Sequence, residues 1–181
     1  NMIVTFHPAT LEENSSGRQF DELLSALGNT DDTHIIFTSS NADTEGRIIS
    51  KKIDDFVLKH PENSIGFSSM GKLNYLSALQ YVDAVVGNSS SGLAEAPSFR
   101  IGTINIGDRQ KGRLKSNSVI DCEPKKGSIL NAIDHLYSKE FQKKLNHVKN
   151  PYGDGHASEK ILDVLRTIDI PSETKKVFHD L

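Results

Sequence analysis

The 181-residue chain lacks the features that mark several large classes of protein. It has a single cysteine, so an intrachain disulfide framework is excluded, and Cys122 follows an apolar run in which a small buried side chain is expected. The sequence contains no run of about 18 apolar residues, the pattern that predicts a transmembrane helix. It also contains no charged segment followed by an apolar one at its start, the pattern that predicts a signal peptide. We therefore expect a protein of a reducing compartment, the cytoplasm, without a membrane partner.

Charge excess and familiar cofactor motifs are also missing. The chain has 21 Lys and Arg against 24 Asp and Glu, and this balance gives no basic surface for nucleic acid. Its seven histidines are dispersed without metal-site spacing, so the sequence predicts neither a metal nor another cofactor. Gly107 and Gly112 have P-loop spacing, but Arg113 and Leu114 replace the required Lys and Ser/Thr. Because no G-x-G-x-x-G follows a predicted strand either, NTPases and dinucleotide dehydrogenases are excluded.

What the chain does contain is a regular alternation of short apolar, β-branched runs with longer amphipathic segments. This alternation predicts right-handed βαβ units and a parallel sheet covered on both faces. The length fits one domain with a substantial core. We therefore predict an α/β, Rossmann-like, doubly wound parallel sheet of about six strands. The predicted strands are 2–6, 34–38, 64–67, 84–87, 103–106 and 118–122.

Between these strands, apolar residues recur at helical spacing, which predicts helices with one buried face. Gly28 and Asn29 supply a stop for the first of these helices. The long second helix is expected from Asp43 to His60, and the last from Ala157 to about Ile168. Residues expected to face the core are Ile48, Ile49, Ile53, Phe56 and Val57 in the second helix, and Leu73, Leu76, Leu79 and Val82 in the third.

The stretch 85–113 combines two features of a ligand site. A strand ending at Gly87 leads through Asn88 and three serines into a helix-compatible segment, and such a helix start favours an anion such as phosphate. The next strand ends in a loop that begins with Gly107 and contains Arg109, Lys111, Arg113 and Lys115. In a parallel sheet both turns lie at the carboxyl edge, where ligands bind. The pattern alone is equally typical of a helix cap beside a solvated loop.

Three segments of this stretch resemble a known family. They are Gly87-Asn88-Ser89-Ser90-Ser91-Gly92, Glu95-Ala96-Pro97-Ser98-Phe99 and Asn105-Ile106-Gly107-Asp108-Arg109-Gln110-Lys111-Gly112-Arg113. They resemble the nucleotide-binding signature of the UDP-N-acetylglucosamine 2-epimerase family. Their residues are most similar to those of hydrolysing members, which release N-acetylmannosamine or a related amino sugar for sialic-acid-type sugars. The resemblance covers essentially the whole chain but only the family's second half, so we expect a truncated enzyme.

The resemblance implies an organisation and a set of partners. Residues 1–170 would be the UDP-binding domain, equivalent to the C-terminal half of a GT-B fold, with 156–170 as the closing helix and 171–181 as a polar tail. The partners implied are UDP, a UDP-N-acetylhexosamine and the missing N-terminal domain, within a full-length homo-oligomer. No nucleic-acid partner is implied.

The same resemblance assigns roles to individual residues. Ser89 and Ser90 would hold the diphosphate with their hydroxyls and backbone N–H groups. Arg109 would grip it through its planar guanidinium, with Arg113 as a weaker candidate. Glu95 would accept hydrogen bonds from the ribose hydroxyls. From the residues alone, Glu95 is equally an acid of the first helical turn, placed there by the helix dipole.

Three further residues match positions that contact the nucleotide in the family. His7 ends the first strand before Pro8 and would reach the diphosphate as the catalytic candidate of this half; a lone loop histidine is otherwise structural or solvated. Asn41 would contact the nucleotide, although a turn residue is the other interpretation. Met70 lies where the family packs uracil against the backbone.

In this family UDP leaves with loss of the C2 proton to give a glycal, and water then adds to give the 2-epimer. Charge developing on the diphosphate requires oriented dipoles and arginine, which this half supplies. The proton-transfer carboxylates belong to the other half, so the chain alone is predicted to be inactive. Two alternatives stay open: the donor-nucleotide domain of a GT-B glycosyltransferase, and a non-catalytic UDP-sugar-binding regulatory module. The sequence of the segment from Asn105 to Arg113 favours the epimerase.

Overall fold

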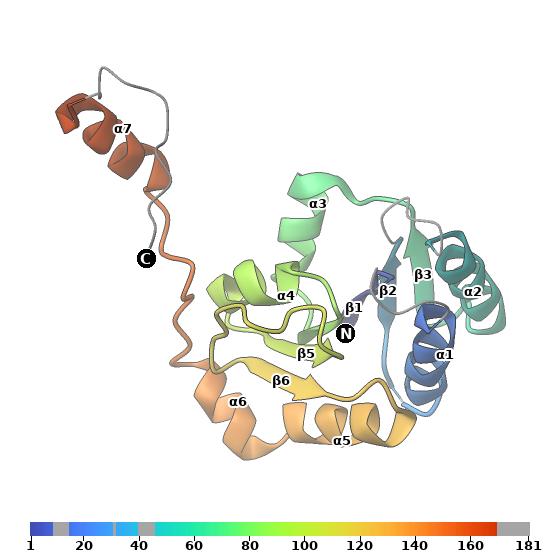
Figure 1. The fold of residues 1–181 in the computed structure, drawn as a ribbon. Helices are drawn as coiled ribbons and strands as arrows, with labels where there is room; N and C mark the ends of the chain where they lie inside the picture. The colour runs from blue at the N-terminus through green and yellow to red at the C-terminus, as the bar shows by residue number, and fades with distance from the viewer. Residues whose placement is uncertain (9–14, 31, 40–45, 170–181) are drawn as a thin grey trace, which may run out of the picture.

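Six strands form one parallel sheet in a computed structural model that describes residues 1–8, 15–30, 32–39 and 46–169 (Figure 1). The strand order is β3-β2-β1-β4-β5-β6, and every neighbouring pair is parallel. This confirms the predicted doubly wound α/β fold and its number of strands. The strands are β1 Met2–Thr5, β2 Ile35–Thr38, β3 Ser64–Phe67, β4 Ala84–Gly87, β5 Gly102–Ile106 and β6 Val119–Cys122.

The strand order reverses direction between β1 and β4, which makes their carboxyl ends the topological switch point of the sheet. Thr5 of β1 lies opposite Gly87 of β4 in the register of this pair. Gly87 has φ +129°, and a Cβ on it would lie 2.0 Å from the carbonyl oxygen of Thr5. Only glycine fits this position, because the two backbones approach closely just where β4 turns toward the candidate site.

Side chains alternate between the two faces of the sheet, and each face has its own core. Met2 and Val4 belong to the larger core, whereas Ile3 belongs to the smaller one. The larger core lies under the helices α1 Ser16–Leu27, α2 Gly46–Lys59, α5 Lys126–Leu136 and α6 Lys139–Leu145. The smaller core lies under α3 Gly71–Ala78, α4 Ser91–Ala94 and the 3-10 helix η1 Ala96–Phe99. The predicted stop at Gly28 is confirmed, since α1 ends at Leu27.

Two predicted core residues are exposed. Ile48 in α2 is 51% exposed and Leu73 in α3 is 79% exposed, so the prediction that they face the core is wrong. Helical spacing identifies residues that share a face but not whether a neighbouring element covers it. Figure 1 shows α3 rising away from the sheet, and no residue within its bounds is buried. Leu79, just after α3, is buried and anchors the helix at its end.

The last described helix, α7 Ala157–Thr167, also has no buried residue, and Figure 1 shows it standing apart from the sheet and its covering helices. Its apolar side chains are exposed; they include Ile161, Leu162, Val164 and Leu165. The predicted tail 171–181 lies outside the described residues. None of the helices that the structure describes is both long enough and apolar enough to cross a membrane.

Candidate functional site

The turn between β4 and α4 lies at the switch point and contains the serines of the central stretch. The backbone N–H of Ser91 donates to Ser89 Oγ at 3.3 Å. Ser90 is exposed and caps α4, its carbonyl accepting a hydrogen bond from the Ala94 N–H at 2.9 Å. The predicted strand, turn and helix start are therefore all present.

The helix that follows this turn is only four residues long and continues as the 3-10 helix η1. So short a helix has a small dipole, so an anion at the turn would be held by individual N–H and O–H donors. Glu95 is the C-terminal cap of α4. Glu95 is also the N-terminal cap of the 3-10 helix η1, an end that favours a carboxylate, so both interpretations of Glu95 stay predictions.

A cavity of about 420 Å³, here called the α3 cavity, lies between α3 and the β4–α4 turn. Three residues predicted for nucleotide binding line it, namely Met70, Ser89 and Glu95. Lys72 and Tyr75 of α3, which the sequence analysis passed over, line it as well. This cavity brings a carboxylate, several hydroxyls, an ammonium and a phenol together beside the apolar side chains of Met70 and Leu76.

The Tyr75 hydroxyl lies 2.6 Å from Ser91 Oγ and so connects α3 to the start of α4. Burial raises the pKa of Tyr75 above its ordinary value, the Ser91 hydrogen bond opposes this, and the nearby Glu95 carboxylate adds to it. The phenol therefore stays neutral at physiological pH and can donate or accept a hydrogen bond. The sequence does carry a sign of this role: Tyr75 is an aromatic residue with a polar group in the helix that directly follows Met70.

A second cavity of about 550 Å³, here called the β6 cavity, lies at the ends of β5 and β6. Its lining includes Asn88, Arg109, Cys122 and Lys125. Burial raises the pKa of the Cys122 thiol to about 12, with a further contribution from Asp121. The thiol is protonated at neutral pH, which makes it a poor nucleophile. Cys122 is partly buried against the larger core rather than fully buried as predicted.

Asn88 lines the β6 cavity, its neighbour Ser89 lines the α3 cavity, and Asn88 joins three strand ends. Its Oδ1 accepts a hydrogen bond from the His7 N–H at 2.7 Å, and its Nδ2 donates to the His7 carbonyl at 2.8 Å. Its own carbonyl accepts hydrogen bonds from Arg109 Nη1 at 3.1 Å and from Gln110 Nε2 at 2.7 Å. The ends of β1, β4 and β5 are thus connected through one side chain and one carbonyl.

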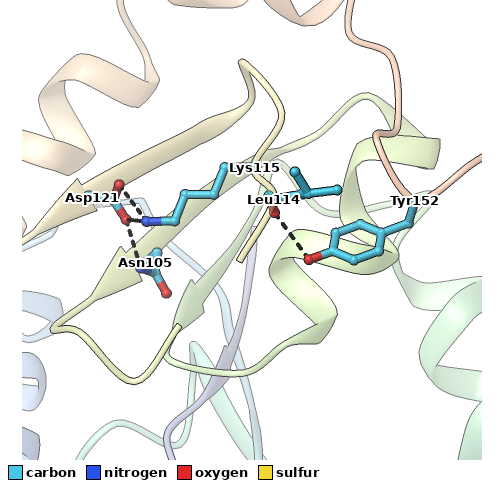
Figure 2. Close-up of polar contacts among 5 residues, drawn as sticks. All are labelled: Asn105, Leu114, Lys115, Asp121 and Tyr152. Carbon is cyan, nitrogen blue, oxygen red and sulfur yellow. Dashed lines mark hydrogen bonds and ion pairs between the residues drawn. The ribbon is translucent and has the colours of Figure 1, made fainter. Parts of the chain in front are cut away.

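The loop between β5 and β6 is fixed at its far end by polar contacts (Figure 2). Lys115 Nζ lies 2.7 and 2.8 Å from the two carboxylate oxygens of Asp121, and Asn105 Nδ2 donates to the same carboxylate at 2.7 Å. The Tyr152 hydroxyl donates to the carbonyl of Leu114 at 3.2 Å. These contacts restrain the loop that begins with Gly107 and Arg109.

The structure brings most of the predicted site residues to one edge of the sheet. Met70, Ser89 and Glu95 share the α3 cavity, with exposed Ser90 beside Ser89. Buried His7 and exposed Arg109 both contact Asn88, His7 through its backbone N–H and Arg109 through its guanidinium. Exposed Arg113 lines neither cavity. Asn41 lies outside the described residues, and the individual roles stay predictions.

A parallel sheet of this order, with polar turns gathered at the switch point, defines a Rossmann-like domain of the kind that binds nucleotides. The family model for UDP-N-acetylglucosamine 2-epimerase matches residues 1–166. The chain therefore belongs to the UDP-N-acetylglucosamine 2-epimerase family, as its sequence motifs indicate.

Two curated relatives match nearly the whole chain. The polysialic acid biosynthesis protein P7 of Escherichia coli is 38% identical over 99% of this chain and 46% of its own length. The GDP/UDP-N,N'-diacetylbacillosamine 2-epimerase (hydrolyzing) of Campylobacter jejuni is 36% identical over 99% of this chain and 46% of its own length. The chain thus spans about half the length of the curated relatives it matches.

Solved structures share the fold. The Neisseria meningitidis UDP-GlcNAc 2-epimerase bound to UDP-GlcNAc has a TM-score of 0.75 at 16% identity, covering 93% of this chain and 45% of its own. A glycosyl transferase C-terminal domain from Francisella tularensis has a TM-score of 0.51 at 12% identity, covering 83% of this chain and 82% of its own. The fold is therefore common to epimerases of this family and to a glycosyltransferase domain.

Proposed function

We propose that this chain is the UDP-binding half of a hydrolysing UDP-N-acetylglucosamine 2-epimerase that serves sialic-acid-type sugar synthesis. The observation that carries the proposal is the α3 cavity, in which Met70, Ser89 and Glu95 lie together. The E. coli relative is named for polysialic acid biosynthesis, and the C. jejuni relative is named as a hydrolysing 2-epimerase. The first name supports a role in sialic-acid-type sugar synthesis, and the second supports an amino-sugar substrate and a hydrolytic outcome.

The lining of the cavity suits the parts of a uridine diphosphate. Half-buried Met70 offers an apolar surface to the uracil ring near the start of α3. Exposed Glu95 offers two carboxylate oxygens to the two ribose hydroxyls. Ser89 and Ser90 offer hydroxyl and backbone donors to the phosphates, and Arg109 adds a positive charge from the next loop. Lys72 lines the same cavity and adds a second cation.

The proposed reaction begins with loss of the proton on C2 of the sugar and departure of UDP from C1, which leaves a double bond between C1 and C2. Water then delivers a hydroxyl to C1 while a proton returns to C2 from the opposite face. The products are UDP and N-acetylmannosamine. The residues of this chain would stabilise the charge that builds on the departing diphosphate, with His7 and Arg109 at the end of the nucleotide nearest the sugar.

The two proton transfers at C2 need groups positioned on the sugar. We infer that a preceding domain supplies them and that this chain alone binds UDP without turning over substrate. In the full-length homo-oligomer, α7 would cross to that domain, and the contact would bury the apolar side chains of α7 that are exposed in this chain. The single cysteine of the sequence, which allows no intrachain disulfide, suits the cytoplasm as the location.

A glycosyltransferase is the second candidate, because a glycosyltransferase domain shares the fold. It would use the same nucleotide site but transfer the sugar to an acceptor. Product analysis of the full-length enzyme separates the two: free 2-epimerised amino sugar with UDP, in the absence of an acceptor, identifies the epimerase. A regulatory module would bind the UDP-sugar and release no product.

Calorimetric titration with UDP tests the binding half of the proposal on the chain itself. We expect saturable binding that weakens about tenfold in Glu95→Ala and in Arg109→Ala, since each removes hydrogen bonds to a charged or hydroxyl group. Glu62→Ala and Arg166→Ala remove exposed charges elsewhere and serve as matched controls with unchanged affinity. Equal affinity in all four variants would reject the assigned site.

A further inference from the structure

Asn88 lies at the centre of the site, yet none of the roles proposed above is assigned to it. The three chain segments that would contact the diphosphate end of the ligand come from different strands. His7 follows β1, the serines follow β4, and Arg109 follows β5. A change in the spacing of these strand ends would separate the groups, and Asn88 is the residue that contacts all three segments.

The carboxamide of Asn88 is matched to the backbone of His7. It accepts the His7 N–H at 2.7 Å and donates to the His7 carbonyl at 2.8 Å, so both ends of the amide are used. Asn88 is 3% exposed, and both hydrogen bonds are buried. A carboxylate of the same shape could accept the first hydrogen bond but would set an oxygen against the His7 carbonyl.

The backbone carbonyl of Asn88 fixes the other side of the site. Gln110 Nε2 and Arg109 Nη1 both donate to it, so one carbonyl oxygen orients the side chains of two consecutive loop residues. Gln110 is fully enclosed, whereas Arg109 is exposed beyond this contact. The hydrogen bond uses one N–H of the guanidinium and leaves its remaining N–H donors for an anion.

We propose that Asn88 is the positioning residue of this site: it holds His7, the serine turn and Arg109 in the one spacing that recognises a diphosphate. The inference rests on the proposed UDP site and adds to it the group that sets its geometry. Asn88 itself contacts the protein rather than the ligand. Its loss should therefore weaken binding of the diphosphate and leave recognition of the nucleoside intact.

Titrations of UDP and of uridine into the chain and its variants test this role. In Asn88→Ala and Asn88→Asp we expect UDP affinity to fall about tenfold while uridine affinity stays within about twofold. Ser64→Ala is the matched control, because it removes one hydrogen bond, from Ser64 Oγ to the His60 carbonyl, on distant β3. A purely structural loss would reduce the folded fraction and lower the binding of both ligands equally.

A double-mutant cycle connects Asn88 to Arg109. Asn88→Ala keeps the backbone carbonyl that accepts from Arg109 and removes the two side-chain hydrogen bonds to His7. If those two bonds fix the place of that carbonyl, Arg109→Ala should weaken UDP binding less in the Asn88→Ala background than in the wild type. Should Asn88→Ala fail to fold, Gln110→Met tests the carbonyl side of the role, because it removes the other donor to the Asn88 carbonyl at similar volume; UDP affinity should again fall while uridine affinity stays within about twofold. Equal losses of affinity for UDP and uridine, or an effect of Arg109→Ala on UDP affinity that is the same in both backgrounds, would overturn the role of Asn88 but not the proposed UDP site. A folded wild-type chain that binds no UDP would overturn the proposed UDP site with it.

Discussion

Replacing Gly87 with alanine should destabilise the domain more than any surface change, because two effects coincide there. Gly87 has φ +129°, a conformation that costs an L-residue about 1–3 kcal/mol. The new methyl group would also lie 2.0 Å from the Thr5 carbonyl oxygen, and relief of such overpacking costs about 1–3 kcal/mol more. We expect a total loss of about 4 kcal/mol, a large share of the roughly 5–15 kcal/mol typical of a domain.

Urea unfolding followed by far-UV circular dichroism measures this loss. With a slope of about 2 kcal/mol per molar urea, the midpoint should fall by about 2 M. Gly127→Ala is the matched control: Gly127 lies in the first turn of α5, and a Cβ there meets nothing within 4 Å. Alanine should stabilise this helical position by up to about 1 kcal/mol. Equal midpoints for the two variants would refute the argument from the β1–β4 contact.

Three further predictions follow from burial and charge. Leu136→Ala should lower the free energy of unfolding by about 2–5 kcal/mol in the same urea assay, because Leu136 is fully buried, whereas exposed Leu58→Ala should change it by less than about 0.5 kcal/mol. The pKa of Cys122 is raised to about 12, so the native thiol should react slowly with a disulfide reagent at pH 8. Its contribution to stability should be complete below the thiol's unfolded pKa of about 9 and be lost as pH rises toward 12. Because the pKa values of Tyr75 and Tyr137 are also raised, Cys122→Ser should lose stability over this range too, and an alkaline unfolding series should show a larger loss in the wild type than in the variant. Deleting residues 157–181 should leave the urea midpoint of the remaining domain unchanged within error, since no residue of α7 is buried.

The local features of the site could be predicted because they depend on short stretches of sequence. The apolar run ending at Gly87, the serines after it and the basic loop after Gly107 are each contiguous, and the structure has the strand, turn and loop that they predict. The family assignment rests on the same contiguous motifs and is confirmed by the match to residues 1–166.

The helical stripes show where such predictions stop. Ile49 and Leu73 both lie at apolar helical positions, yet Ile49 is buried and Leu73 is exposed. Spacing along one helix fixes which residues share a face. Whether that face is covered depends on elements far away in the sequence, and α3 has too little cover to bury its own residues.

The sequence by itself determined the α/β alternation, the parallel sheet, the family and the position of the candidate site at the carboxyl edge. Only the tertiary structure decided the strand order, the separation of the edge into two cavities, and the hydrogen bonds that Asn88 makes to His7, Arg109 and Gln110. The physical reason is distance along the chain. His7 and Asn88 are 81 residues apart, and their contact exists because β1 and β4 pair at the centre of the sheet. No local pattern of apolar and polar residues encodes that pairing.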